Sequence, residues 1–89
     1  MADVVIYTTH FCSYCVRAKL LLSRKSVAFQ EIDVSRDPEK RRWLAEVTGQ
    51  STVPQIFING QSVGGCDDIH DLDRQGRLDP LLRAPARGH

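Results

Sequence analysis

Two cysteines, Cys12 and Cys15, stand where a strand pattern gives way to a helix pattern. The run before them, at positions 3–8, reads DVVIYT and is rich in the β-branched and aromatic residues of short strands. The run at positions 13–25 contains no Gly or Pro, the residues that interrupt helices. Three of its residues recur at helical spacing and would share one face: Cys15, Ala18 and Leu22. The chain is therefore expected to begin with a strand and an amphipathic helix that packs on a sheet.

A second strand and a second helix are predicted next. Positions 27–34 (VAFQEIDV) alternate imperfectly between apolar and polar side chains, as a second strand would. The Asp-Pro-Glu run at positions 37–39 supplies an N-cap oxygen, a proline at the first helical position and an acid near the positive end of the helix dipole. We expect the helix that starts there to continue through Val47 and to stop at Gly49.

A β-hairpin and a third helix are predicted in the second half of the chain. The strands at 55–58 and 61–63 flank Asn59-Gly60, a pair suited to the two positive φ angles of a type I′ turn. Two glycines then allow a tight backbone path into an acidic helix that begins at Cys66 and ends near Gly76. The hairpin strands should pair antiparallel, whereas the first two strands, joined by a helix, should pair in parallel.

These elements predict an α/β fold, with a four-stranded mixed sheet flanked by helices in the order β-α-β-α-β-β-α. The chain has 89 residues, which is enough for one core and too few for two domains. We therefore expect a single domain over residues 1–83, closed by a last helical turn that Asp79-Pro80 caps. Residues 84–89 have nothing apolar to bury and are expected to fray.

The charge balance and the hydropathy pattern argue against several function classes. A formal net charge of +1 gives none of the bulk positive field on which nucleic-acid binders rely. No apolar run approaches the ~20 residues that cross a bilayer, and the amino-terminal MADVVIYTT lacks the features of a signal peptide. Three cysteines, an odd number, argue against a secreted disulfide scaffold. We therefore expect a cytoplasmic protein without nucleic-acid or membrane partners.

The Cys-Ser-Tyr-Cys motif at positions 12–15, placed between a strand and a helix, is typical of a thiol redox centre. Cys12 would lie at the helix N-terminus, where unpaired N–H groups and the helix dipole favour the thiolate, whereas Cys15 would lie about one turn inside. Because a thiolate is the attacking species in disulfide exchange, the motif predicts Cys12 as the nucleophile and Cys15 as the resolving thiol. The alternative is that both cysteines simply pack in a core.

A metal site is the competing interpretation of these cysteines. Four side chains of the kind that zinc prefers are available in the chain: His10, Cys12, Cys15 and Cys66. Their spacing disfavours zinc, because His10 and Cys12 flank a strand-to-helix turn and the chain has no second Cys-x-x-Cys or His pair. We therefore predict no metal site and interpret His10 as a solvated loop histidine.

Four motifs in order carry a resemblance to a known family. They are YTTHFCSYC at 7–15, STVPQIFING at 51–60, VGGCDD at 63–68 and LDPLL at 78–82. With these motifs the chain closely resembles the glutaredoxin family, in particular its short bacterial dithiol members, over nearly its whole length. The Trp-Cys-Gly-Pro-Cys motif typical of thioredoxins is absent.

This resemblance implies a thioredoxin-like fold and a glutathione site. Pro54 would be the cis-proline of the fold, which lets the Val53 backbone pair with the cysteinyl part of glutathione. The amides of Cys66 and Asp67 would receive the γ-glutamyl carboxylate, and the Asp67 carboxylate would meet the γ-glutamyl amino group. The implied glutathione-binding set is Tyr14, Thr52, Val53, Pro54, Gly65, Cys66 and Asp67. By themselves, the residues around Pro54 could equally be a strand lead-in and Asp67 a plain helix cap.

The sequence departs from the family pattern in two places. Many members carry a Lys shortly before the first cysteine, and here Thr9 stands at that position, which leaves the glycine carboxylate of glutathione without its usual cation. Arg41, Arg42 or Gln50 could compensate. Ser13 follows Cys12 where proline is usual in dithiol members, so the helix start keeps an N–H and gains a hydroxyl.

The resemblance implies a glutathione-dependent thiol-disulfide oxidoreductase. Its co-substrate would be glutathione, and its partners would be glutathionylated and disulfide-containing proteins. A second hypothesis is a [2Fe-2S] cluster held between two subunits by Cys12 and glutathione, as in family members that resemble this chain and carry Ser at this position. We expect a monomer, and a dimer only if such a cluster is bound.

Overall fold

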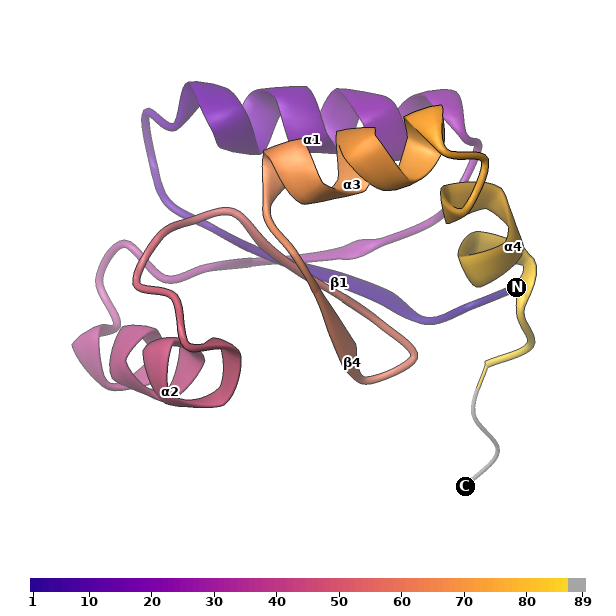
Figure 1. Cartoon of the computed structure of the whole chain (residues 1–89). Coiled ribbons are helices and arrows are strands. Elements are labelled where there is room, and N and C mark those ends of the chain that lie inside the picture. Colours follow the sequence, from indigo (N-terminus) through magenta and orange to yellow (C-terminus); the bar gives the residue numbers. More distant parts are fainter. Residues whose placement is uncertain (87–89) are drawn as a thin grey trace.

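A computed structural model of the chain describes residues 1–86 (Figure 1). Its elements in chain order are β1 (Val4–Thr8), α1 (Ser13–Arg24), β2 (Gln30–Asp33), α2 (Pro38–Thr48), β3 (Gln55–Ile58), β4 (Gln61–Gly64), α3 (Cys66–Arg74) and α4 (Leu78–Arg83). The predicted order of strands and helices is thus confirmed, with α4 in place of the single last turn. Of the tail predicted at 84–89, residues 87–89 lie outside the described part of the chain.

The four strands form one mixed sheet in the order β2-β1-β3-β4. β1 pairs in parallel with β2 through the crossover helix α1, and it pairs antiparallel with β3 on its other side. β3 and β4 form the predicted antiparallel hairpin, with a register shift between Ile56 and Phe57. The turn between them has φ angles of 52° at Asn59 and 79° at Gly60, the positive values that the Asn-Gly pair predicts. The α/β fold with a four-stranded mixed sheet is therefore confirmed.

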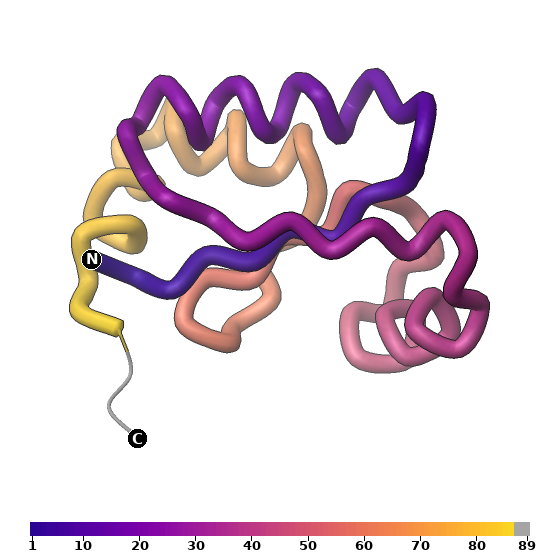
Figure 2. Tube along the Cα trace, turned by 180° about the vertical axis from the view of Figure 1, so that it is seen from behind, coloured from indigo at the N-terminus to yellow at the C-terminus, as the bar shows by residue number. Residues whose placement is uncertain are grey.

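The helices cover the two faces of the sheet unequally. In Figures 1 and 2, α1 and α3 lie together over one face, and α2 lies on the opposite face. Because side chains alternate along β1, Ile6 points into the larger core cluster under α1 and α3, whereas Tyr7 belongs to the smaller cluster under α2. The predicted apolar face of α1 is confirmed, since Cys15, Ala18 and Leu22 are all buried.

Two element boundaries differ from the prediction. β2 spans Gln30–Asp33 rather than 27–34, because it is an edge strand whose ladder with β1 pairs only these four residues. The last helix begins at Leu78, so Asp79 lies in its first turn and does not cap it. The Asp79 carboxylate instead pairs with the Lys25 ammonium, Oδ1 lying 2.9 Å from Nζ, which ties α4 to the end of α1.

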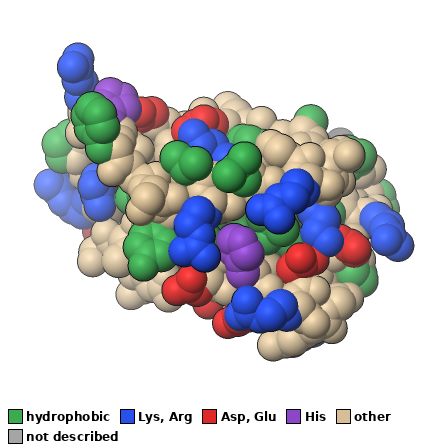
Figure 3. Space-filling model, turned by 90° about the horizontal axis from the view of Figure 1, so that it is seen from above, with side chains coloured by type: hydrophobic (Ala, Val, Ile, Leu, Met, Phe, Trp, Pro, Cys, Tyr) green, Lys and Arg blue, Asp and Glu red, His purple; other side chains and the backbone are tan. Residues whose placement is uncertain are grey.

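The helix-covered surface carries charges of both signs. Figure 3 views the molecule from the side of α1 and α3, where lysine and arginine side chains lie among acidic and apolar ones. This mixture accords with the near-zero net charge of the chain. Within residues 1–86, no helix is long and apolar enough to cross a membrane.

Candidate active site

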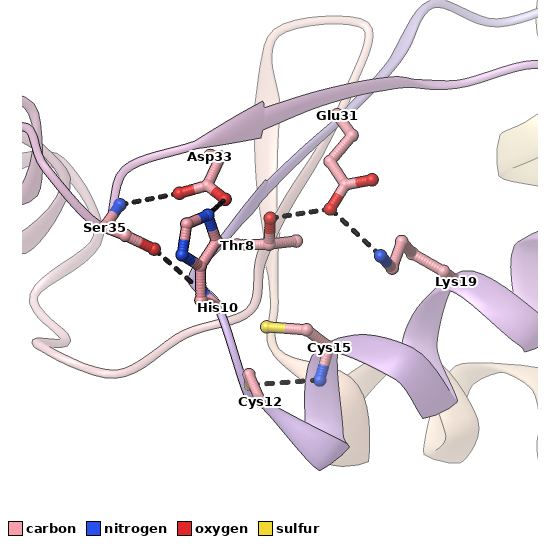
Figure 4. Close-up of polar contacts among 8 residues, drawn as sticks. All are labelled: Thr8, His10, Cys12, Cys15, Lys19, Glu31, Asp33 and Ser35. Carbon is pink, nitrogen blue, oxygen red and sulfur yellow. Dashed lines mark hydrogen bonds and ion pairs between the residues drawn. The ribbon is translucent and has the colours of Figure 1, made fainter.

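Cys12 lies at the N-terminus of α1, where it is the N-cap residue with an extended backbone (φ −112°, ψ 105°). The backbone N–H of Cys15 donates to the Cys12 Sγ at 3.1 Å, so the sulfur takes the place of the oxygen of an ordinary capping side chain (Figure 4). The first turn of α1 contains no acidic residue. The sulfur is half-buried, and it lies 3.9 Å from the Val53 carbonyl oxygen. A partly accessible thiol thus faces the free N–H end of a helix.

Cys15 lies in a different environment, one turn inside the same helix. Its side chain is 2% exposed, and burial raises the pKa of the Cys15 thiol to about 12, with the hydrogen bond to Cys12 acting in the same direction. Cys15 is therefore a protonated thiol at neutral pH. Both cysteines are free thiols here, so the structure corresponds to the reduced protein.

A groove of about 250 Å³ is lined in part by Val53, whose carbonyl oxygen lies 3.9 Å from the Cys12 sulfur. All seven residues that the family resemblance assigns to glutathione line it: Tyr14, Thr52, Val53, Pro54, Gly65, Cys66 and Asp67. They come from α1, from the loop before β3 and from the start of α3, segments far apart in the sequence. The Val53–Pro54 peptide bond is cis, as the resemblance implies. Two further residues, Gln50 and Asp68, complete the lining.

The start of α3 forms the wall of the groove opposite the loop before β3. Gly65 is the N-cap residue, and its backbone N–H donates to the Asp68 Oδ2 at 2.8 Å. A Cβ atom at Gly65 would lie 3.1 Å from the backbone oxygen of Pro54, so the absence of a side chain allows the two walls to approach closely. Asp67 is exposed in the first turn of this helix and faces the groove.

The lining of the groove contains carboxylates and no Lys or Arg. Thr9, at the position of the usual lysine, lies instead in a second hollow on the other side of Cys12. Arg41 donates from Nη2 to the Ser51 carbonyl oxygen at 3.2 Å, close to the loop but outside the lining. Of the three residues expected to compensate for the missing lysine, the structure brings only Gln50 into the groove among those it describes.

The second hollow is lined by Cys12 and by residues of the loop after β1, of β2 and of α1, several of which are shown in Figure 4. His10 Nε2 lies 2.8 Å from Asp33 Oδ2, so this exposed loop histidine has a carboxylate partner. The Glu31 carboxylate accepts from Lys19 and from the Thr8 hydroxyl, and these two contacts hold the pKa of Glu31 below its usual value.

The third cysteine, Cys66, is buried at the start of α3. Burial raises the pKa of its thiol, and its Sγ lies 3.5 Å from His70 Nδ1. Throughout residues 1–86, no three His, Cys, Asp or Glu side chains are grouped as ligands of a metal ion would be. The four side chains considered as zinc ligands are therefore not brought together.

One polar residue of the site was missed by the sequence analysis. Gln55 is the first residue of β3 and is fully buried, although its neighbours in the strand are apolar. Its amide nitrogen donates to Thr52 O and to Gln50 Oε1, both at 3.0 Å. A glutamine inside the otherwise apolar run QIFI was the available signal, because a buried amide requires a specific partner.

The geometry agrees with comparisons of the sequence with known proteins. The glutaredoxin family model matches residues 4–63. The chain is 58% identical over 84 residues to a glutaredoxin of Pseudomonas aeruginosa, covering 94% of this chain and 100% of that protein. It is 53% identical over 83 residues to glutaredoxin 3 of Escherichia coli, covering 93% of this chain and 100% of the other.

Solved structures give the same result. The solution structure of a glutaredoxin from Brucella melitensis matches with a TM-score of 0.85 and 53% identity, over 93% of this chain and 90% of that chain. The crystal structure of a buckwheat glutaredoxin-glutathione complex matches with a TM-score of 0.87 and 33% identity, over 91% of this chain and 76% of that chain. These matches confirm the thioredoxin-like fold that the four motifs imply.

Proposed function

The chain belongs to the glutaredoxin family of thiol-disulfide oxidoreductases, and from this premise we propose that it uses glutathione to reduce protein-glutathione mixed disulfides and protein disulfides. The observation that carries the proposal is the difference in environment between Cys12 and Cys15, which lie within one turn of α1. The Cys12 sulfur is partly accessible and receives an N–H donor, whereas Cys15 is buried and protonated. Such a pair supplies one thiol that attacks the substrate disulfide and one resolving thiol that reacts in a later step.

The groove is proposed to bind the glutathione part of the substrate. Its lining by the loop before β3 and by the start of α3 supports this, as does the glutathione complex of the buckwheat relative. The Val53 backbone pairs with the cysteinyl part, and Tyr14 lies beside the reacting sulfur. At the α3 end, the amides of Cys66 and Asp67 bind the γ-glutamyl carboxylate, and the Asp67 carboxylate binds the amino group. Gln50 then offers an N–H donor of the lining to the glycyl carboxylate.

Reduction of a mixed disulfide takes two exchange steps. The Cys12 thiolate attacks the glutathionyl sulfur, so that a Cys12–glutathione disulfide forms and the protein thiolate leaves and takes a proton from water. The thiolate of a second glutathione then attacks the glutathionyl sulfur on Cys12 and releases glutathione disulfide. Each step forms one S–S bond and breaks one, and in the net reaction one glutathione thiol is oxidised to glutathione disulfide while one protein thiol is freed.

A protein disulfide requires the second cysteine. Cys12 forms a mixed disulfide with one substrate sulfur and releases the other as a thiol. Cys15 then loses its proton and attacks the Cys12 sulfur, which expels the substrate as a dithiol and leaves a Cys12–Cys15 disulfide. Two glutathione molecules reduce that disulfide in turn. A cytosol kept reducing by glutathione is the compartment in which this cycle turns over, and we propose it as the location of the protein.

The experiment that tests the proposal is a coupled assay. Reduction of a small glutathione mixed disulfide is followed as NADPH oxidation in the presence of glutathione and glutathione reductase. We expect turnover that depends on glutathione and saturates with the mixed disulfide. With glutathione as the reductant in both cases, equal kcat/KM values for the glutathione mixed disulfide and for the mixed disulfide of an unrelated small thiol would contradict a glutathione site.

A shared iron-sulfur cluster is the second candidate, favoured by Ser13 in place of the usual proline after Cys12. A [2Fe-2S] cluster needs four thiolates. Because residues 1–86 contain no group of three metal ligands, one chain would offer Cys12 alone, with glutathione and a second chain supplying the rest. Anaerobic reconstitution with iron, sulfide and glutathione should then give a brown dimer that Cys12→Ser loses. A colourless monomer would eliminate this candidate.

A further inference from the structure

Gln55 is a buried polar side chain at the edge of the groove. It is 0% exposed, and it stands at the start of β3 directly after the cis-proline. Its Nε2 donates to the Thr52 carbonyl oxygen and to Gln50 Oε1, each at 3.0 Å, whereas its Oε1 is buried without a partner among the described residues. A buried acceptor without a donor lowers the stability of the protein. The favourable contribution of the Gln55 amide must therefore come from the two hydrogen bonds that its NH2 group donates.

These contacts fix the orientation of two side-chain amides, first that of Gln55 and through it that of Gln50. The Thr52 carbonyl can only accept, so the NH2 group of Gln55, rather than its oxygen, must face it. The second hydrogen of the same NH2 group points to Gln50, which must therefore present its oxygen to Gln55. The NH2 group of Gln50 is then the end of its side chain that is left for another partner.

The backbone of Gln50 is held as firmly as its side chain. The Gln50 N–H donates to the Thr48 hydroxyl oxygen at 3.1 Å, and that hydroxyl donates in turn to the Leu44 carbonyl oxygen of α2 at 2.6 Å. Gln50 itself is exposed and lines the groove. Its amide therefore has a defined place and a defined polarity, with nitrogen rather than oxygen available to a ligand.

We propose that Gln55 is a positioning residue that turns the amide of Gln50 so that the groove offers N–H donors to an anionic oxygen of the bound ligand. This inference rests on the proposed function, in which that oxygen belongs to the glycyl carboxylate of glutathione. The groove lining carries two carboxylates at its α3 end and no Lys or Arg, so the donors that the lining itself offers to a carboxylate at the other end are neutral. An oxygen of Gln50 turned toward the groove would repel it.

The test reverses the polarity of the amide. In Gln55→Glu, the buried carboxyl holds at most one proton, which the Thr52 carbonyl oxygen accepts, so only oxygen lone pairs face Gln50, which must turn its NH2 group inward and present oxygen to the groove. Two substrates are compared for each variant: the mixed disulfide of glutathione and that of glutathione amide, in which a carboxamide replaces the glycyl carboxylate. The wild type should show the lower KM for the carboxylate substrate. The ratio of the two KM values should change by about fivefold in favour of the carboxamide in Gln55→Glu, the worth of one hydrogen bond.

Two further variants distinguish a change in the KM ratio caused by Gln50 from a general loss of structure. Gln55→Met fills a similar volume without hydrogen bonds and leaves Gln50 free to turn, so it should give a KM ratio between those of wild type and Gln55→Glu. In a Gln50→Ala background, Gln55→Glu should leave the ratio unchanged, because the amide that it turns is gone. A general loss of structure lowers turnover of both substrates together and does not move the ratio.

The outcomes separate this inference from the function on which it rests. If the wild type reduces the glutathione substrate but neither Gln55→Glu nor Gln55→Met changes the KM ratio, Gln55 does not position Gln50. If Gln55→Glu changes the ratio equally with and without Gln50, the effect does not pass through Gln50, and the inference is also wrong. Failure of the wild type to reduce either substrate would instead remove the proposed function itself.

Discussion

The helices α1 and α3 both begin beside the groove with a cysteine, yet they use their free N–H groups differently. In α1, Cys12 is the N-cap residue, its sulfur accepts from the N–H of Cys15, and the first turn contains no acid. In α3, the cysteine comes one position later, after Gly65, and the first turn holds two aspartates. In α3 the side chain of the third residue, Asp68, accepts from the Gly65 N–H, whereas in α1 the Cys12 sulfur accepts from the N–H of the third residue.

This difference shows that position at the helix end, rather than the presence of cysteine, decides what a thiol can do. At the N-cap, a side chain points toward the free N–H groups and remains accessible. One residue later, the Cys66 side chain turns into the core, where burial raises the pKa of its thiol. The start of α1 is thus suited to stabilise a thiolate. The start of α3, with free N–H groups and an exposed aspartate, is suited to bind a ligand that carries both a positive and a negative group.

The largest expected effect comes from removing the sulfur at the α1 start. Cys12→Ser should abolish reduction of glutathione mixed disulfides, because no other thiol is both accessible and placed at a helix end. Cys15→Ser should retain much of this activity, because a second glutathione can replace the resolving thiol. The coupled NADPH assay measures both, and substantial turnover by Cys12→Ser would refute the assignment of the nucleophile.

Alkylation separates the thiols without any substrate. With iodoacetamide at neutral pH and mass-spectrometric mapping, Cys12 should be modified first. Cys15 should react appreciably only as the pH approaches 12, since the thiolate is the reacting form and burial raises its pKa to about that value. Rapid labelling of Cys15 or Cys66 in the native protein would contradict the contrast between the two helix starts.

The next effect concerns the geometry of the α3 start. Gly64 has a φ of +101°, and a Cβ atom there would overlap the side chain of Asp68. Gly64→Ala should therefore lower the free energy of unfolding by about 1–3 kcal/mol, measured by urea denaturation. Gly76→Ala is the matched control, because Gly76 also has a positive φ but has open space around it. Equal losses in the two variants would show that the capping aspartate plays no part.

A smaller effect is expected from the exposed acid of the α3 start. Asp67→Asn keeps the shape of the side chain but removes the charge that is proposed to meet the γ-glutamyl amino group. The KM for the glutathione mixed disulfide should rise by about tenfold, with little change in kcat, which reports the loss of a charge-assisted hydrogen bond. An unchanged KM would mean that glutathione does not reach this end of the groove.

The smallest effect should come from making α1 resemble α3. Ser13→Asp introduces an acid into a first turn that has none, and its charge opposes the build-up of negative charge on the neighbouring sulfur. The alkylation rate of Cys12 at neutral pH should fall about two- to fivefold, as expected from a charge near a helix end. Ser13→Asn controls for size, and a fall as large in that variant would show that charge is not the cause.

Most of the fold could be predicted because local chemistry specifies it. Asp37 caps α2 by accepting from the Lys40 N–H, and Asn59-Gly60 turns the hairpin, as their residue types require. The limits of β2 could not be predicted in the same way. They depend on how many residues the neighbouring strand β1 offers for pairing, which is a property of the sheet rather than of the segment.

The residues of the site can also be separated into those that the sequence predicts and those that depend on tertiary contacts. The two cysteines follow from a motif at a predicted strand-helix junction, and the seven residues proposed to bind glutathione come from a family resemblance that four separate motifs support. The amide chain from Thr52 through Gln55 to Gln50 has no such signature, because it depends on side chains meeting in three dimensions. The partner of Asp79 could not be predicted either, because its carboxylate pairs with Lys25 of another element instead of capping its own helix.

The close approach of Gly65 to Pro54 also bears on the kinetics of ligand capture. Because a Cβ atom would be only 3.1 Å from the opposing backbone oxygen, the two walls of the groove already stand as near each other as side chains permit. Because the two walls are already in place at this point, little conformational entropy has to be lost there when a ligand binds. Association should therefore follow a single exponential whose rate rises linearly with ligand concentration and reaches no plateau.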